Sequence, residues 1–254
     1  MTKGTQVVIT APNSKDFRSI DDENTEKDSS RNMFDTIDAS GTGLKEIPSS
    51  WYPQLHISRL LASHNAISEI EDGIQMMRFL VYVDLSYNHL TSISDALCGL
   101  PYLKILLLVD NKIQEIPEKI NKLKQLEELD VSQNQLTSIP EHLAKNESLK
   151  ALILAENQIT ALPEEMGKFS FLEILDLRAN YLMELPKSLC DMINLESLSI
   201  DDNPLRSPPV QVVKSGLKHI MAYLRKDALA NTHTNTTPVN VDAPDAMNKA
   251  KNSV

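Results

Sequence analysis

The chain has 254 residues, of which 41% are apolar and 5% aromatic, and its formal net charge is −10. No apolar run approaches the roughly 18 residues that a membrane-spanning helix needs, so we expect no transmembrane segment. The N-terminal residues contain no long apolar stretch, so we also expect no signal peptide. The acidic charge disfavours nucleic acid and anionic membrane surfaces as main partners.

Residues 1–33 come first and show no apolar periodicity, so we expect this segment to be disordered. From residue 34 onward the chain is periodic, because an asparagine with similar apolar neighbours recurs every 23 residues. An earlier unit has Thr42 in place of the asparagine. The seven asparagines are Asn65, Asn88, Asn111, Asn134, Asn157, Asn180 and Asn203.

Each unit has the pattern of a short strand, a turn and a short helical segment. In the stretch "LVYVDLSYNHLTSI", Val83 and Leu85 alternate with other residues just before Asn88, which is typical of a strand with one buried side. Stacked units would bury a continuous core, and their asparagine amides would form a ladder that bonds neighbouring turns. Pairs such as Ile120 and Leu123 have the spacing of a helical turn that packs inward.

Three positions depart from this pattern. Glu71 and Ser94 stand where other units have a proline, and Asn146 replaces the usual apolar residue near the end of a helical segment. We expect local loosening at these positions. Trp51 occupies a core position of the first unit, and we interpret it as a core or cap residue.

The repeat resembles the leucine-rich repeat family, whose pattern is LxxLxLxxNxL. The resemblance implies an α/β leucine-rich repeat solenoid: a curved arc with a concave parallel β-sheet, short helical or extended segments on the convex side, and a C-terminal capping helix. We accordingly expect a disordered segment at 1–33, an array of about eight units at 34–208, the capping helix at 209–228 and a disordered tail at 229–254.

The end of the array has its own signature. The run Asn203-Pro204-Leu205, Pro208-Pro209, Gly216, Ile220 and Tyr223-Leu224 is similar to the terminus of cytoplasmic Ras-group leucine-rich repeat proteins. The first interpretation of this helix is a cap over the open edge of the core. The alternative is a helix that docks on a partner or on a membrane surface.

The two cysteines give information about the compartment. Cys98 and Cys190 are 92 residues apart, which is four units. Neighbouring strands lie about 4.8 Å apart, so the two residues would be roughly 20 Å apart. A disulfide needs Cα atoms within about 7 Å. Unpaired cysteines without cysteine-rich flanks favour a reducing, cytoplasmic location.

We find no catalytic motif and no metal-ligand spacing, so we expect no enzyme activity, no cofactor and no metal site. Residues six, four, two and one positions before each asparagine should instead face the concave side of the sheet. There, aliphatic and acidic residues alternate, which suits a protein partner that presents Lys or Arg beside an apolar anchor. The aliphatic residues could also simply shield one another across neighbouring strands. The predicted partner-binding residues are Arg59, Leu61, Tyr82, Asp84, Tyr87, Ile105, Leu107, Val109, Glu128, Asp130, Ile153, Ile174, Asp176 and Arg178.

The sequence therefore predicts a non-enzymatic intracellular module for protein–protein interaction, monomeric on its own. The resemblance to Ras-group proteins implies a scaffold or regulator in signal transduction, with a small GTPase, a kinase or a phosphatase subunit as partner. The alternative is a structural adaptor in cytoskeletal or ciliary assemblies.

Overall fold

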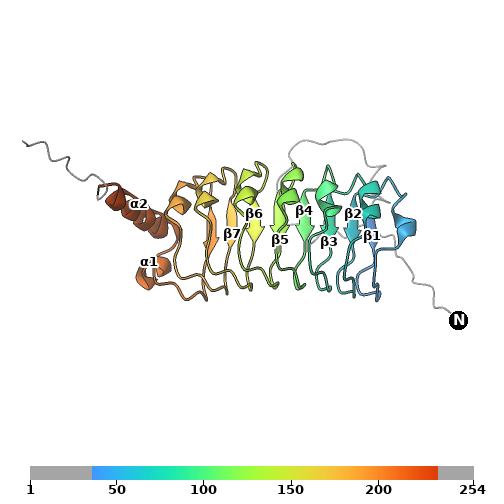
Figure 1. Ribbon diagram of the computed structural model, residues 1–254, viewed down its shortest axis with the longest axis horizontal. Helices are drawn as coiled ribbons and strands as arrows, with labels where there is room; N and C mark the ends of the chain where they lie inside the picture. Colours follow the sequence, from blue (N-terminus) through green and yellow to red (C-terminus); the bar gives the residue numbers. More distant parts are fainter. Residues whose placement is uncertain (1–35, 234–254) are drawn as a thin grey trace, which may run out of the picture.

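The computed structural model describes residues 36–233 of the chain. Eight strands of three residues each form one parallel sheet, in which the strands follow one another in sequence order (Figure 1). This architecture confirms the predicted solenoid. The strands are β1 (Thr36–Asp38), β2 (Arg59–Leu61), β3 (Tyr82–Asp84), β4 (Ile105–Leu107), β5 (Glu128–Asp130), β6 (Ala151–Ile153), β7 (Ile174–Asp176) and β8 (Ser197–Ser199).

The 23-residue period sets the register of the sheet. Each residue of β1 to β7 pairs with the residue 23 positions later, so that Ile105 lies beside Glu128 and Glu128 lies beside Ala151. Because side chains alternate along a strand, the middle residue of each strand points into the core and its two neighbours point outward. Leu106, for example, is fully buried in the middle of β4. Equivalent positions of all units therefore form straight rows across the sheet.

A short 3-10 helix lies between each pair of strands and packs on the opposite side of the core. These helices are η1 (Ser49–Trp51), η2 (Asp72–Met76), η3 (Leu97–Gly99), η4 (Glu118–Lys122), η5 (Glu141–Lys145), η6 (Glu164–Lys168) and η7 (Lys187–Asp191). A proline directly precedes five of them, because a fixed φ and a missing N–H suit the entry to a helix. The two helices without this proline differ in length, because η3 has three residues and η2 has five, and η1 has only three residues after its proline.

The expected loosening at Asn146 is wrong. This side chain is 4% exposed, donates to the Leu123 carbonyl at 3.1 Å and accepts N–H bonds from Ser148 and Leu149. The amide therefore closes the end of η5 by hydrogen bonds where other units use an apolar contact.

A single aliphatic core runs through all the units. Trp51 is 7% exposed and belongs to this core at its N-terminal end. Cys98 and Cys190 are both buried free thiols in different 3-10 helices. The core thus needs no covalent cross-link, because each unit covers the apolar side of the next.

Two helices close the C-terminal end of the array (Figure 1): α1 (Val210–Lys214) and α2 (Leu217–His233). Ile220 and Leu224 of α2 are buried, and Lys187 of η7 pairs with Asp227 at 2.8 Å. Gly216, at a φ of 86°, permits the break between the helices.

The single helix expected over 209–228 is therefore two helices, and the second one continues to residue 233. Residues 229–233 are helical although we expected disorder from 229 onward. The rest of the two segments expected to be disordered, 1–33 and 234–254, lies outside the described residues.

Candidate interaction surface on the strand face

The outward side of the sheet carries the predicted partner-binding residues, and we call it the strand face. It consists of the residues six, four, two and one positions before each asparagine, or before Thr42 in the first unit. Of the predicted residues, Tyr87, Ile174 and Arg178 are exposed and Asp176 is buried. The half-buried ones are Arg59, Leu61, Tyr82, Asp84, Ile105, Leu107, Val109, Glu128, Asp130 and Ile153.

The centre of the strand face is an acidic pair between aliphatic neighbours. Glu128 lies beside Ile105, while Asp130 lies between Leu107 and Ile153. Burial raises the pKa of Glu128, and the charge of Asp130 raises it further. The two carboxylates are therefore incompletely hydrated, and a cation brought to them would relieve that cost.

Asp130 is also held in place by hydrogen bonds. Burial raises its pKa most strongly, whereas hydrogen bonds from the Ser132 hydroxyl and backbone N–H, at 2.6 and 2.9 Å, oppose the rise. The charges of Asp176 and Asp84 raise the pKa further, so the net direction is upward. The carboxylate is thus fixed in orientation but remains poorly solvated.

Asp176 lies in the same row but has a partner within the chain. The Arg178 guanidinium donates to both of its carboxylate oxygens, at 2.7 to 3.0 Å, and Asp176 is only 8% exposed. Residues two apart on a strand point to the same side, so this pair was readable from the sequence. The structure therefore does not present Asp176 as an open acidic site.

The aspartates that stand four positions before an asparagine, or before Thr42, have a structural role that the sequence analysis missed. Each accepts a hydrogen bond from the backbone N–H two residues later, as Asp84 does from Ser86 at 2.9 Å. The same bond is made by Asp38, Asp130 and Asp176. An aspartate two residues before a turn is a known signal for this bond.

Aromatic side chains pack at the N-terminal part of the strand face. The Arg59 guanidinium lies 4.7 Å from the centre of the Tyr82 ring. The rings of His64 and Tyr87 stack with their centres 4.2 Å apart. These contacts fix large side chains in defined positions, which reduces the entropy that a partner's binding would cost.

The residue before each asparagine adopts an unusual backbone conformation. All seven have φ between 51 and 56°, in the left-handed region that non-glycine residues seldom adopt. None of these residues is a glycine, so composition gave no signal for the turn. They are His64, Tyr87, Asp110, Gln133, Glu156, Ala179 and Asp202.

The asparagines lie beneath the strand face and hold these turns. Asn88 donates to the carbonyls of Leu85 and Ser86 in its own unit and of Ala62 in the unit before, at 3.0 to 3.1 Å. Its Oδ1 atom accepts from the Ile67 N–H at 2.9 Å. Asn65, Asn111, Asn134, Asn157, Asn180 and Asn203 make the equivalent bonds.

The strand face is strongly acidic. Its rows contain nine carboxylates and two guanidinium groups, a net charge of −7 within the −10 of the whole chain. Such a field attracts and orients cationic partners. The charged residues are Asp38, Asp84, Asp110, Glu128, Asp130, Glu156, Asp176, Asp201, Asp202, Arg59 and Arg178.

Within residues 36–233, no group of three or more His, Cys, Asp or Glu side chains is placed to hold a metal ion. None of the helices described here is long and apolar enough to cross a membrane. Stacked parallel strands joined by a buried asparagine ladder define the chain as a solenoid of short repeats.

The profile of the family described as "Leucine rich repeat" matches residues 56–113, 101–159 and 147–205. The chain belongs to this family, whose arrays act as protein–protein interaction modules and are typically not enzymes. No curated protein matches the sequence.

Solved structures of similar fold come from distant organisms. A leucine-rich repeat protein of Leptospira interrogans is 27% identical with a TM-score of 0.64, over 67% of this chain and 44% of its own. The ectodomain of the Arabidopsis thaliana receptor kinase GASSHO1/SCHENGEN3, in complex with CASPARIAN STRIP INTEGRITY FACTOR 2, is 32% identical with a TM-score of 0.57. That match covers 63% of this chain and 20% of the receptor. The chain thus spans less than half the length of both.

Proposed function

We propose that this protein is a non-enzymatic intracellular interaction module that binds a protein partner on its strand face. The observation that carries the proposal is the half-buried pair Glu128 and Asp130, set between Ile105, Leu107 and Ile153. Burial has raised the pKa of both carboxylates, so the ionised pair gains from a cation that takes the place of lost water.

A partner that fits this centre presents a Lys or Arg beside an apolar side chain. The cation would contact Glu128 and Asp130, and the apolar group would cover Leu107 and Ile153. Interfaces commonly combine an apolar centre with complementary charges, which set orientation and association rate. The surrounding charge of the strand face would guide such a partner toward the pair.

For the cellular setting we propose a scaffold or regulator in small-GTPase, kinase or phosphatase signalling. The resemblance of the run from Asn203 to Leu224 to cytoplasmic Ras-group proteins supports it. Two buried free thiols, Cys98 and Cys190, support a reducing compartment. We propose that the chain is monomeric before it binds its partner.

The test is affinity capture from native lysate with the full chain and the double variant Leu107→Glu with Ile153→Lys. The variant should lose the main partner, because a new charge replaces each apolar contact on both sides of Asp130. The control is Gln114→Glu with Gln158→Lys, which makes the same charge changes at exposed positions outside the strand face. Circular dichroism should show that all three proteins are folded.

The captured partner separates the two functional classes. A small GTPase, a kinase or a phosphatase subunit supports the signalling role, whereas tubulin or actin-linked proteins support a structural adaptor. A folded double variant that still captures the same partner would contradict the strand-face site itself.

A further inference from the structure

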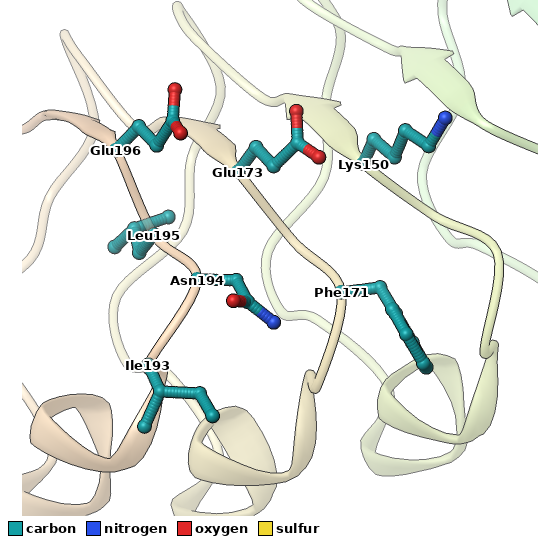
Figure 2. A pocket seen from close by; sticks show the side chains of 7 residues that line it. All are labelled: Lys150, Phe171, Glu173, Ile193, Asn194, Leu195 and Glu196. Atoms are coloured by element: carbon teal, nitrogen blue, oxygen red, sulfur yellow. The ribbon is translucent and has the colours of Figure 1, made fainter.

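A hollow lies on the loops that lead into the C-terminal strands, outside the strand face. Its volume is about 340 Å³, and it is lined by Lys150, Phe171, Glu173, Ile193, Asn194, Leu195 and Glu196 (Figure 2). Figure 2 shows Phe171 and Ile193 projecting from two neighbouring loops, with Lys150, Glu173 and Glu196 in a row where the strands begin. None of these residues belongs to the site proposed above.

The apolar part of the hollow is not required by the fold. Ile193 is 85% exposed and Phe171 is 51% exposed, whereas Leu172 and Leu195 beside them fill the core. The positions equivalent to Ile193 in earlier units hold Leu55, Arg78, Pro101, Lys124, Glu147 and Ser170. A position that tolerates all these residues does not need an isoleucine for folding, so its exposed side chain is available for contact.

The two loops are tied together. The Asn194 side-chain amide donates to the backbone carbonyl of Ser170, directly before Phe171. This bond holds the loop that carries Ile193 against the loop that carries Phe171. The hollow is therefore preformed, and an occupant does not have to order it.

The charged rim of the hollow is mainly acidic. Glu127, on the far side of Lys150, binds both Lys150 and Lys104 at 3.0 Å. Glu173 and Glu196 form no ion pair with any residue that the structure describes. The hollow therefore combines exposed apolar surface with two carboxylates that have no ion-pair partner among residues 36–233.

We propose that this hollow is a second docking site, which binds an extended protein segment carrying a large apolar side chain next to a Lys or Arg. The apolar side chain lies between Phe171 and Ile193, and the cation contacts Glu173 and Glu196. Anionic lipids and nucleic acids would be repelled by the same carboxylates. A symmetric pairing with a second copy would oppose Glu173 and Glu196 of both copies, and such like-charge contacts are unfavourable.

The test uses the ¹⁵N-labelled full chain and three blocked peptides: Gly-Lys-Phe-Lys-Gly, Gly-Glu-Phe-Glu-Gly and Gly-Lys-Ser-Lys-Gly. The first should give saturable shifts of the backbone amides at 171–174 and 193–196. The peptide with glutamates and the peptide without the aromatic ring should each bind at least about tenfold more weakly, a difference of about 1.4 kcal/mol.

Variants of the hollow sharpen the test. Ile193→Ser should weaken binding of the lysine–phenylalanine peptide about tenfold or more. Glu173→Lys with Glu196→Lys should reverse the preference toward the glutamate peptide. The matched controls are Tyr181→Ser, which removes another side chain that is 58% exposed, and Glu164→Lys at an exposed position of η6. Neither control should change the affinity.

Three results would overturn the proposal. The first is the absence of saturable shifts at millimolar peptide, and the second is a set of shifts confined to Glu128, Asp130 and their neighbours. The third is sedimentation that shows a dimer of the chain which Ile193→Ser dissociates, because the occupant would then be a second copy. These results leave the strand-face site open, since its own test uses different residues.

Discussion

Replacing Asn134 by alanine tests the ladder at its middle. The Asn134 side chain donates to the carbonyls of Leu108, Val131 and Ser132 at 2.8 to 3.2 Å. Its Oδ1 atom accepts the backbone N–H of Ile113 at 2.9 Å. Alanine removes all four bonds, and it cannot replace the acceptor for the buried Ile113 N–H.

The structure gives the size of the effect. The carbonyls of Leu108 and Val131 keep a second donor, from Asn111 and Asn157, so they are not left unpaired. The Ile113 N–H has no such substitute. An unpaired buried N–H costs about 1–3 kcal/mol, and each lost hydrogen bond about 0.5–1.5 kcal/mol. We therefore expect Asn134→Ala to lower the free energy of unfolding by about 3–5 kcal/mol.

Urea unfolding followed by circular dichroism measures this loss, and Asn65→Ala is the matched comparison. Asn65 and Leu44, whose backbone N–H donates to Asn65, are only half-buried, so water can replace the missing bonds. We therefore expect the free energy of unfolding to fall by only about 1–2 kcal/mol. Hydrogen exchange should accelerate most at the Ile113 amide in Asn134→Ala. Equal losses for the two variants, with unchanged exchange at Ile113, would refute the reasoning.

Three further outcomes follow from the charges and the turns. Asp130→Asn should leave the urea midpoint at pH 7 unchanged or higher. The raised native pKa means that ionisation opposes folding, at a cost that is absent below the unfolded-state pKa and complete above the native pKa; a lower midpoint would contradict this. The pKa of Glu127 is lowered, since hydrogen bonds from Lys150 and Lys104 outweigh its burial, so Glu127→Gln should cost less than about 1 kcal/mol at pH 7. That cost should begin to decrease as the pH falls below about 4 and vanish below the lowered native pKa, in unfolding curves taken across pH. At Ala179, with a φ of 51°, valine should reduce the free energy of unfolding by at least about 1 kcal/mol relative to glycine, and equal values would count against backbone strain at this turn.

The sequence predicts most of the fold, because a single period controls many contacts at once. The 23-residue spacing of the asparagines defines the register of the strands, and the alternation around Val83 and Leu85 identifies the buried side. The length of α2 was harder to predict. After Leu224 no side chain at 225–230 is buried, so the apolar pattern that marks Ile220 and Leu224 ends before the helix does.

The candidate site was less predictable, because the exposure of a side chain depends on the adjacent side chains as well as on the side of the sheet to which it points. Asp176 and Asp130 occupy equivalent positions, but the residue two places later is an arginine in one unit and a serine in the other. Arg178 forms an ion pair with Asp176, whereas the uncharged Ser132 leaves the charge of Asp130 open to a cation from a partner. The hollow beside Phe171 and Ile193 escaped prediction because it lies at repeat positions whose residue type varies from unit to unit.

The asparagine ladder also gives the array a direction. Each asparagine side chain bonds to its own unit and to the preceding one, and none bonds to the following unit. Asn203, for example, accepts the N–H of Leu182 in the preceding unit. Loss of the last unit would therefore leave a backbone N–H of its neighbour unpaired. Loss of the first unit would only free part of the side chain of Asn65, which water can reach. The two ends are thus unequal, and fraying should begin at the C-terminal end wherever α1 and α2 detach.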